Sequence, residues 1–263
     1  MVIACPNCRI YLAVDRPPFT VLICPQCSHH FQMSPSVAII GSQDRTLTFA
    51  PEAFEVASRE LAMSVIMTSE PGTTTAERWE IETEFLVDDI GRRLNLDARH
   101  CVLDYGCGIG RVAKPLIERY GCRVVGVDTS ESMRSLATDY VQSDRFVVWS
   151  LEELAEQIRL GFQADCCICL WVIQHAFDAA EVIASIASAL RADGLVYAIN
   201  QSERVVPTSH GWHNDGIDVI ELLRRSFSEV SCHSLPLKVA TARLSAITKI
   251  QLLRKRPQSH ATP

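Results

Sequence analysis

The chain has 263 residues, of which 48% are hydrophobic and 21% charged, and its formal net charge is −6 at pH 7. This length fits one α/β domain plus a small module, and the apolar content predicts a well-filled core. The acidic balance argues against a nucleic acid partner, because proteins that grip that backbone usually present a basic face. The longest apolar run, residues 166–173, is too short to span a membrane, and no secretory leader is recognisable. We therefore expect a cytoplasmic protein with no membrane partner.

Two C-x2-C pairs, Cys5 with Cys8 and Cys24 with Cys27, stand near the start of the chain. Four thiolates in this spacing can complete a closed tetrahedral zinc site. Short alternating apolar stretches between and after the pairs indicate strands, so residues 1–33 are predicted to form a zinc ribbon. A Cys3His site that uses one of the histidines at 29–30 stays open. A closed site has no free position for a substrate, so this Zn2+ should be structural, and the ribbon could also dock a protein partner.

Residues 34–75 are expected to form a helical linker segment. Phe54, Ala57, Leu61 and Val65 recur at spacings of three and four, which predicts a helix over residues 51–67. A second helix is predicted over residues 76–94, and its expected buried side consists of Trp79, Ile81, Phe85, Leu86, Ile90 and Leu94. This helix opens the main domain, which is predicted to span residues 76–256 and to be followed by a tail at 257–263.

The most informative stretch begins at Val102, where an apolar run leads through Asp104 into Gly106, Gly108 and Gly110. This pattern predicts a strand, a tight turn and a helix, with bare backbone that a ligand can approach closely. A second apolar run ends in Asp128, at the tip of the next predicted strand. An acid at that place can accept hydrogen bonds from both hydroxyls of a ribose. The two features together predict a nucleoside site at the carboxyl edge of a parallel sheet.

The stretch from Val102 to Gly110 resembles the first motif of the class I S-adenosylmethionine-dependent methyltransferases, and the resemblance extends from about residue 78 to 254. It implies a doubly wound, mostly parallel, seven-stranded sheet of the Rossmann-like methyltransferase fold, with an antiparallel last strand. The cofactor would be S-adenosylmethionine, and it would be held by residues of the motif and of the helix before it. The resemblance implies that Gly106, Cys107 and Gly108 line the methionine end and that Gly110 also binds the cofactor. It further implies that Asp104 holds the ammonium directly or through water, Arg78 the carboxylate and Asp128 the ribose.

Further landmarks of the family follow in order. Residues 149–154 resemble the segment that borders adenine, where Ser150 or the backbone of Leu151 could replace a carboxylate that many relatives have. Trp149 could cover the adenine ring or belong to the core. Residues 164–175 resemble the fourth strand and the turn after it, which implies that Leu170 and Trp171 lie beside the sulfonium and His175 at the rim of the substrate pocket.

The rest of the chain continues the alternation of strands and helices. Helices are predicted over residues 178–191 and 218–227, and strands over 195–199, 230–233 and 244–253. Between them, the loop at 200–216 contains His210, Trp212 and His213 close to the expected substrate mouth. His175, His210 and His213 are therefore the candidate catalytic residues.

We expect an S-adenosylmethionine-dependent methyltransferase that moves a methyl group to an oxygen or nitrogen atom of a small molecule. Methyl transfer is an in-line displacement, so the enzyme mainly supplies alignment and excludes water, and a base is needed only for an acceptor that keeps its proton. Two alternatives stay open: a methyltransferase acting on ribosomal or transfer RNA, and a non-catalytic adaptor that binds S-adenosylmethionine.

Overall fold

The computed structural model describes residues 49–68, 73–202, 204–209 and 211–257, and four short strands before them. These strands pair as two antiparallel hairpins, β1 (Val2–Ala4) with β2 (Tyr11–Ala13) and β3 (Val21–Ile23) with β4 (His30–Gln32). The predicted zinc ligands Cys5, Cys8, Cys24 and Cys27 lie outside the described residues. Among the helices described, none is long and apolar enough to cross a membrane.

A seven-stranded sheet forms the centre of the main domain, in the order β12-β13-β9-β8-β5-β6-β7. The strands from β5 to β9 run parallel, whereas β13 is antiparallel to both of its neighbours, as predicted for the last strand. Their bounds are β5 (Cys101–Tyr105), β6 (Arg123–Val127), β7 (Phe146–Trp149), β8 (Ala164–Leu170), β9 (Leu190–Gln201), β12 (Phe227–Ser234) and β13 (Thr248–Lys255).

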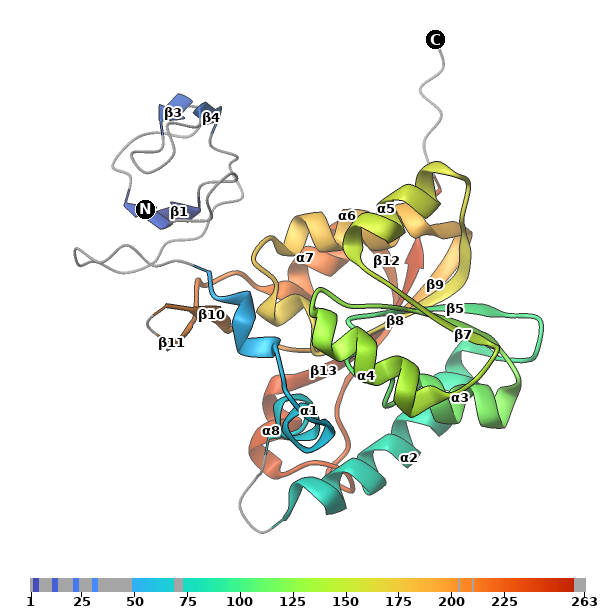
Figure 1. Cartoon of the computed structure of the whole chain (residues 1–263). Helices are drawn as coiled ribbons and strands as arrows, with labels where there is room; N and C mark the ends of the chain where they lie inside the picture. The colour runs from blue at the N-terminus through green and yellow to red at the C-terminus, as the bar shows by residue number, and fades with distance from the viewer. Residues whose placement is uncertain are drawn as a thin grey trace.

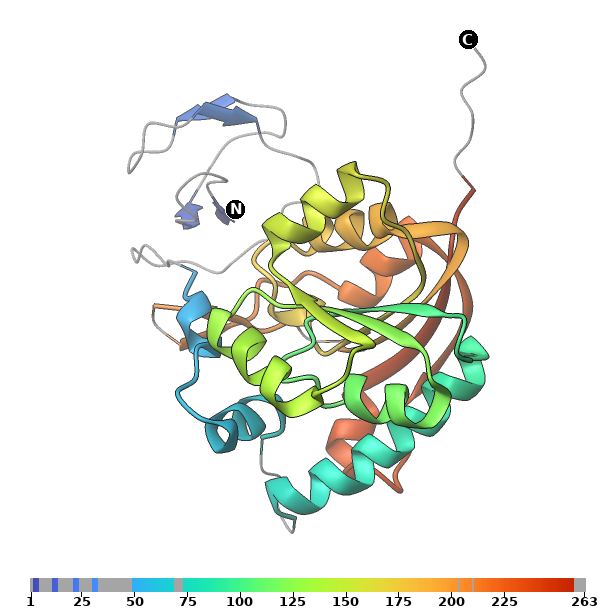
Figure 2. The ribbon, with the colours of Figure 1, turned by 45° about the vertical axis from the view of Figure 1, so that its right-hand side comes forward.

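Helices cover both faces of this sheet (Figures 1 and 2). Val102 faces α2, α3 and α8, whereas its neighbour Leu103 faces α5, α6 and α7, because successive side chains of a strand point to opposite faces. The helices are α1 (Arg59–Ile66), α2 (Thr75–Leu94), α3 (Ala113–Tyr120), α4 (Glu131–Val141), α5 (Leu151–Arg159), α6 (Ala179–Ala189), α7 (Val219–Ser226) and α8 (Ala242–Ile247). The predicted α/β layering is thus confirmed for the main domain.

The helix predicted over residues 51–67 is interrupted. A short 3-10 turn, η1 (Pro51–Phe54), comes first, and Ser58 then caps α1 by accepting a hydrogen bond from the N–H of Leu61. Glu55 between them is extended, because this part of the chain turns to contact the main domain. Helix α1 buries Ala62 in a cluster with Ile109, inside the glycine motif, and Met133 on α4.

Helix α2 differs from the prediction in which residues it buries. Ile81 was expected inside but is 55% exposed, whereas Glu82 and Asp89 are buried. Both acids form ion pairs with arginines, so the inner side of this helix accommodates charge as well as apolar surface. The helix begins at Thr75, after a capping box formed by Thr74 and Glu77.

The strand predicted over residues 244–253 is wrong in its first half. Thr241 caps α8, and the strand β13 begins only at Thr248. Strand β9 is longer than predicted and follows α6 directly, with Asp193 in a left-handed conformation. Beyond it, a separate hairpin pairs β10 (Val206–Thr208) with β11 (Gly211–His213) near the carboxyl edge of the sheet.

Candidate functional site

The glycine motif forms a loop between β5 and α3 that is tied to the neighbouring strand. The N–H groups of Gly106 and Cys107 both donate to the carbonyl oxygen of Val127, at 2.7 and 3.0 Å. Gly106 has φ +77°, and a Cβ there would lie 2.2 Å from a methyl carbon of Val172, so only glycine fits. The thiol of Cys107 is buried beneath the loop, so this residue can offer a ligand its backbone but not its sulfur.

Asp128 follows β6, and its carboxylate faces the same loop. One oxygen accepts from the N–H of Gly108 at 2.8 Å, and the other from the N–H of Ser130 at 3.0 Å. Burial raises the pKa of Asp128 above its usual value, while these two hydrogen bonds act in the opposite direction. The loop and the acid expected to bind a ribose are therefore one hydrogen-bonded unit.

Asp104 lies at the end of β5 beneath the loop and is only 4% exposed. Among the described residues, its carboxylate has no hydrogen-bond or ion-pair partner. Burial, together with the charge of Asp128, raises its pKa from 3.8 to about 7. A buried acid without a partner is costly to ionise, so the site offers a place for a cation such as an ammonium group.

Arg78, expected to bind the cofactor carboxylate, belongs to a buried cluster of charges. Its guanidinium lies 3.3 Å from Glu82 and also donates to the carbonyl oxygen of Thr68. Glu82 in turn pairs with Arg111 at 3.0 Å, and Arg111 lies over the ring of Trp79. Two arginines share one glutamate, so the cluster has one excess positive charge next to the glycine loop.

The segment expected to border adenine is engaged locally. Ser150 caps α5: its hydroxyl accepts from the N–H of Glu153, whose carboxylate accepts from the N–H of Ser150 at 2.6 Å. The ring of Trp149 meets Phe162 edge-on at 5.0 Å, and both Trp149 and Leu151 pack on the core under α5 and α6. The core alternative for Trp149 is the one that the contacts favour.

The turn after β8 contains a strained residue. Trp171 has φ +57°, a left-handed conformation that is unusual for a large side chain. Its N–H donates to the carbonyl oxygen of Ile199 at 2.6 Å, which fixes the turn against β9. Leu170 and Trp171 are both half-buried against the core on the α2 side of the sheet. Strain of this kind is concentrated at functional sites.

His175 stands at the rim beyond β8, and both of its ring nitrogens are engaged. Nδ1 lies 2.6 Å from the carbonyl oxygen of Val205 and must donate to it. Nε2 lies 3.0 Å from the amide nitrogen of Gln174. Burial lowers the pKa of His175, so the ring is held neutral.

Three rings from separate segments meet at this rim. The centroid of His175 lies 6.0 Å from that of Phe54 and 5.3 Å from that of Trp212, and the last two are 5.9 Å apart. We call Phe54, His175 and Trp212 the aromatic cluster. Trp212 is 56% exposed, so the cluster presents an open aromatic face at the carboxyl edge.

A second described candidate base, His213, lies on β11. Nε2 of His213 is buried and has no hydrogen-bond partner among the described residues. His210 lies outside the described residues. The structure thus places His175 and His213 at the same edge, and of these two described histidines only His213 has a ring nitrogen without a hydrogen-bond partner.

Residues 103–198 match the model of a family described as a methyltransferase domain. The matched region runs from β5, just ahead of the glycine loop, into β9. The chain contains a methyltransferase domain. Residues 49–67 and the hairpin that contributes Trp212 lie outside the matched region.

Named relatives resemble this methyltransferase domain rather than the whole chain. Methyltransferase GfsG from Streptomyces halstedii is 31% identical over 42% of this chain and 41% of its own length. Ubiquinone biosynthesis O-methyltransferase from Rickettsia typhi (strain ATCC VR-144 / Wilmington) is 27% identical over 47% of this chain and 51% of its own length. The chain therefore spans about half, or less, of these curated relatives.

A solved structure shares the fold over a larger part of the chain. Magnesium protoporphyrin IX methyltransferase from Synechocystis PCC 6803, with bound S-adenosylhomocysteine, has 18% sequence identity and a TM-score of 0.53. The similarity covers 78% of this chain and 98% of that chain. At this identity the likeness shows the fold of the methyltransferase domain alone.

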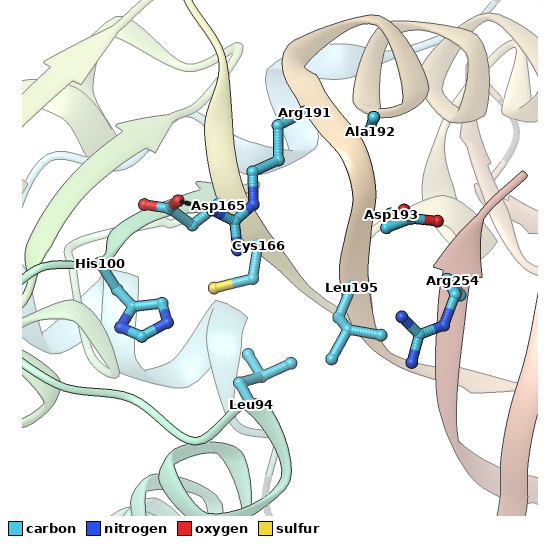
Figure 3. A pocket seen from close by; sticks show the side chains of 9 residues that line it. All are labelled: Leu94, His100, Asp165, Cys166, Arg191, Ala192, Asp193, Leu195 and Arg254. Carbon is cyan, nitrogen blue, oxygen red and sulfur yellow. Dashed lines mark ion pairs between the residues drawn. The ribbon is translucent and has the colours of Figure 1, made fainter. Parts of the chain in front are cut away.

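A cavity of about 360 Å³ opens at the opposite edge of the methyltransferase domain (Figure 3). It lies where β5 and β8 begin, away from the glycine loop, and Arg191 and Asp165 form an ion pair across it at 2.8 Å. Asp165 also accepts from the N–H of Cys101 at 2.7 Å. These contacts stabilise the strand starts, and no predicted site residue within the described part of the chain lines this cavity.

Sequence reasoning missed several residues that shape the site. Arg111, directly after the last glycine of the motif, could have been noticed as a cation beside the loop. Gln174 precedes His175 and could have been noticed as its neighbour, but its orientation depends on β9. Glu82 shares a face of α2 with Arg78, a spacing of four that predicts an ion pair.

Proposed function

We propose that the chain binds S-adenosylmethionine at the glycine loop and transfers its methyl group to an oxygen or nitrogen atom of a small molecule. The observation that supports this most is the unpartnered, buried carboxylate of Asp104 beneath a loop that has room only for glycine at Gly106. The carboxylate suits the cofactor's ammonium, whereas it would repel the pyrophosphate of a dinucleotide.

The other residues of the site complement the rest of the cofactor. Asp128 offers acceptor oxygens to the ribose hydroxyls, and the excess positive charge on Arg78 and Arg111 suits the carboxylate. Gly108 and Gly110 both have positive φ, and a Cβ there would clash with Ile66 or Val141, so the loop keeps a bare backbone. Leu170 lies at the end of β8. Ser150 and Leu151 would border adenine through their backbone, since the Ser150 hydroxyl caps α5.

When bound, the cofactor supplies an electrophilic methyl group on a positively charged sulfur. This chain's residues contribute orientation and exclude water: the loop fixes the cofactor, and the aromatic cluster bounds the acceptor. An acceptor hydroxyl must lose its proton as its oxygen takes the methyl group. The proposed receiver is Nε2 of His213, which is buried in this structure and has to be uncovered for the acceptor to reach it. His175 has no free nitrogen and serves as a wall.

The acceptor side favours an uncharged, flat molecule. The aromatic cluster offers ring faces, and the nearby cation Arg204 is already paired with Asp215 and donates to the carbonyl oxygens of Ala176 and Phe177. Among the described residues, this rim thus has little net charge to attract an ion. The name of the relative from Rickettsia typhi, an O-methyltransferase, supports an oxygen acceptor as the first choice.

The decisive experiment measures the binding of S-adenosylhomocysteine by calorimetry and then follows labelled methyl groups into metabolite extracts and RNA. Binding of wild type, a loss of at least about tenfold in Asp128→Ala, and label in small molecules would support the proposal. Asp139→Ala, an exposed acid on α4, is the matched control. Label in RNA would show that the acceptor is RNA and not a small molecule. Binding of the cofactor without any methyl transfer would favour the non-catalytic adaptor.

We further propose that Cys5, Cys8, Cys24 and Cys27 hold one structural Zn2+. Support comes from the two hairpins: the pairs Ala4↔Tyr11 and Ile23↔His30 close connections of equal length, residues 5–10 and 24–29, and each contains one C-x2-C pair in the same place. Metal analysis should find one zinc per chain, lost in the Cys5→Ser, Cys8→Ser double variant and kept in Cys232→Ser. Folded protein without metal would refute the site.

The division into a ribbon at 1–33, a linker at 34–75, the methyltransferase domain at 76–256 and a tail remains part of this proposal. So do a protein partner for the ribbon and a location in the cytoplasm. Limited proteolysis followed by mass spectrometry tests the division, because exposed connections between folded units are cut first.

A further inference from the structure

One segment, residues 49–67, contacts both the cofactor side and the acceptor side of the site, and we call it the strap. It begins at the hairpin of β10 and β11, where Phe49 bridges Thr208 and the N–H of Ala50 donates to the carbonyl oxygen of Pro207 at 3.1 Å. It then runs through η1 and α1 (Figures 1 and 2). The strap lies outside the matched family region.

The far end of the strap packs directly on the glycine loop. A Cβ on Gly108 would lie 2.8 Å from Cδ1 of Ile66, so this side chain already rests on the bare backbone. Ala62 and Met67 form a buried cluster with Ile109, inside the glycine motif, and with Met133 on α4. The strap therefore covers the loop that would bind the methionine end of the cofactor.

The middle of the strap is hydrogen-bonded to residues next to Asp128, the acid proposed to bind the ribose. The carboxylate of Glu55 accepts hydrogen bonds from the hydroxyls of Ser132 at 2.7 Å and Ser130 at 3.0 Å. The N–H of Val56 donates to the hydroxyl of Ser132 at 2.9 Å. Ser130 is also the residue whose N–H donates to Asp128. Ser130 thus links Glu55 to Asp128, the residue that would bind the ribose.

The residue before Glu55 points to the other side of the site. Phe54 contacts His175 and Trp212 in the aromatic cluster. Two adjacent residues of the strap therefore make contacts on both sides of the site: Glu55 with the serines that follow Asp128, and Phe54 with the aromatic cluster. If the strap moves away from one of them, it must also move away from the other, because a single peptide unit joins Phe54 to Glu55.

We propose that the strap closes over the bound cofactor and that Glu55 is the positioning residue that keeps it closed, which couples release of the cofactor to opening of the acceptor rim. This rests on the proposed function. Glu55 is exposed and makes hydrogen bonds to hydroxyls, contacts that are individually modest and readily exchanged for water, as a reversible closure requires.

The test measures how fast S-adenosylhomocysteine leaves the full-length protein, by surface plasmon resonance on immobilised chains. Glu55→Gln keeps the shape of the side chain but removes the charge that strengthens these hydrogen bonds, so dissociation should become about tenfold faster. Glu52→Gln, an exposed glutamate on the same segment, should stay within twofold of wild type. Hydrogen exchange in residues 49–67 should rise in Glu55→Gln only.

A second variant probes the coupling from the acceptor side. Phe54→Ala removes the ring contacts and leaves the Glu55 hydrogen bonds, so under the proposal it also speeds dissociation, by severalfold. The melting temperature without ligand separates the roles: a drop in stability with unchanged dissociation in both variants means that the strap is only structural, and overturns the proposal. A wild-type protein that does not bind S-adenosylhomocysteine would instead refute the proposed function, while hydrogen exchange would still report whether Glu55 fastens the strap.

Discussion

The side-chain amide of Gln174 determines the protonation state of His175. Its oxygen accepts from the N–H of Gln201 at 2.6 Å, which leaves the amide nitrogen facing Nε2 of His175 at 3.0 Å. Because Nδ1 of His175 donates to the carbonyl oxygen of Val205, Nε2 must accept. A proton on Nε2 would face the hydrogens of the amide, so the network opposes the imidazolium and adds to the effect of burial.

Replacing Gln174 by glutamate should invert this preference. In Gln174→Glu one carboxylate oxygen still accepts from Gln201, and the other faces Nε2 of His175 and favours its proton. The pKa of His175, below 6.5 in the wild type, should rise by at least about one unit. Proton NMR titration of the histidine ring measures this. Gln163→Glu, at an exposed position before β8, is the control; an unshifted His175 in Gln174→Glu would mean that the amide does not govern it.

The raised pKa of Asp104 leads us to expect that cofactor binding depends on pH. Its pKa of about 7 without cofactor means that much of the carboxyl is protonated at pH 6 and must lose a proton to pair with an ammonium group. The affinity for S-adenosylhomocysteine should therefore rise between pH 5.5 and 7.5, and Asp104→Asn should weaken binding and remove the slope. Methylthioadenosine, which lacks the ammonium and carboxylate, is the control ligand and should show no such slope.

The same shift has the opposite consequence for stability. A folded-state pKa above the usual 3.8 means that the folded protein binds more protons than the unfolded chain between about pH 4 and 7, so stability falls as pH rises through this range. Asp104→Asn should thus raise the melting temperature of the ligand-free protein at pH 8, by at least about 3 °C. A lower melting temperature would show that the carboxylate has a stabilising partner.

The glycine loop was predictable from sequence because its constraint is local. Gly106 and Gly108 adopt positive φ, Asp104 is the last residue but one of β5, and Asp128 directly follows β6, all within short patterned stretches. The mostly parallel, seven-stranded sheet with an antiparallel last strand followed from the resemblance. The rim was not predictable in this way: the partner of His175 is Val205, and Glu55 meets Ser130 from a separate segment, so these pairs depend on the fold.

Errors in the helix and strand bounds have a related cause. Apolar spacing over residues 51–67 is satisfied by a helix, but the contacts of Glu55 with α4 require an extended stretch in the middle. Residues 244–253 are apolar enough for a strand, yet Thr241 offers an N-cap that starts α8 first. Arg78 lies where the prediction put it, but Glu82 already occupies part of its guanidinium.

Gly106 should be far more sensitive to substitution than Gly161, although both have positive φ. Gly161 has φ +95° with no atom within 4 Å of an added Cβ, so Gly161→Ala should cost only the backbone strain, about 1–2 kcal/mol. Gly106→Ala adds the contact with Val172 at 2.2 Å and should cost a further 1–3 kcal/mol or so. Urea unfolding measures both. Adding Val172→Ala should recover part of the loss in Gly106→Ala, and no recovery would locate the strain elsewhere.

Arg78 and Arg111 share Glu82 but should differ in what they contribute. The side chain of Arg111 is only 5% exposed, and Arg111→Met removes one of the two cations paired with the buried Glu82. The free energy of unfolding should therefore fall by about 3 kcal/mol. Arg78→Met removes a more accessible cation, 10% exposed, while Glu82 keeps Arg111, so its stability cost should be smaller.

Ligand binding separates the two arginines further. If Arg78 binds the cofactor carboxylate, Arg78→Met should lower the affinity for S-adenosylhomocysteine by at least about tenfold in calorimetry. The affinity for methylthioadenosine should not change, because that compound has no carboxylate. The comparison of the two ligands removes any general effect of the substitution on the shape of the site. An equal loss of affinity for both ligands would mean that Arg78 supports the loop. Unchanged affinity for both would assign binding of the carboxylate to Arg111.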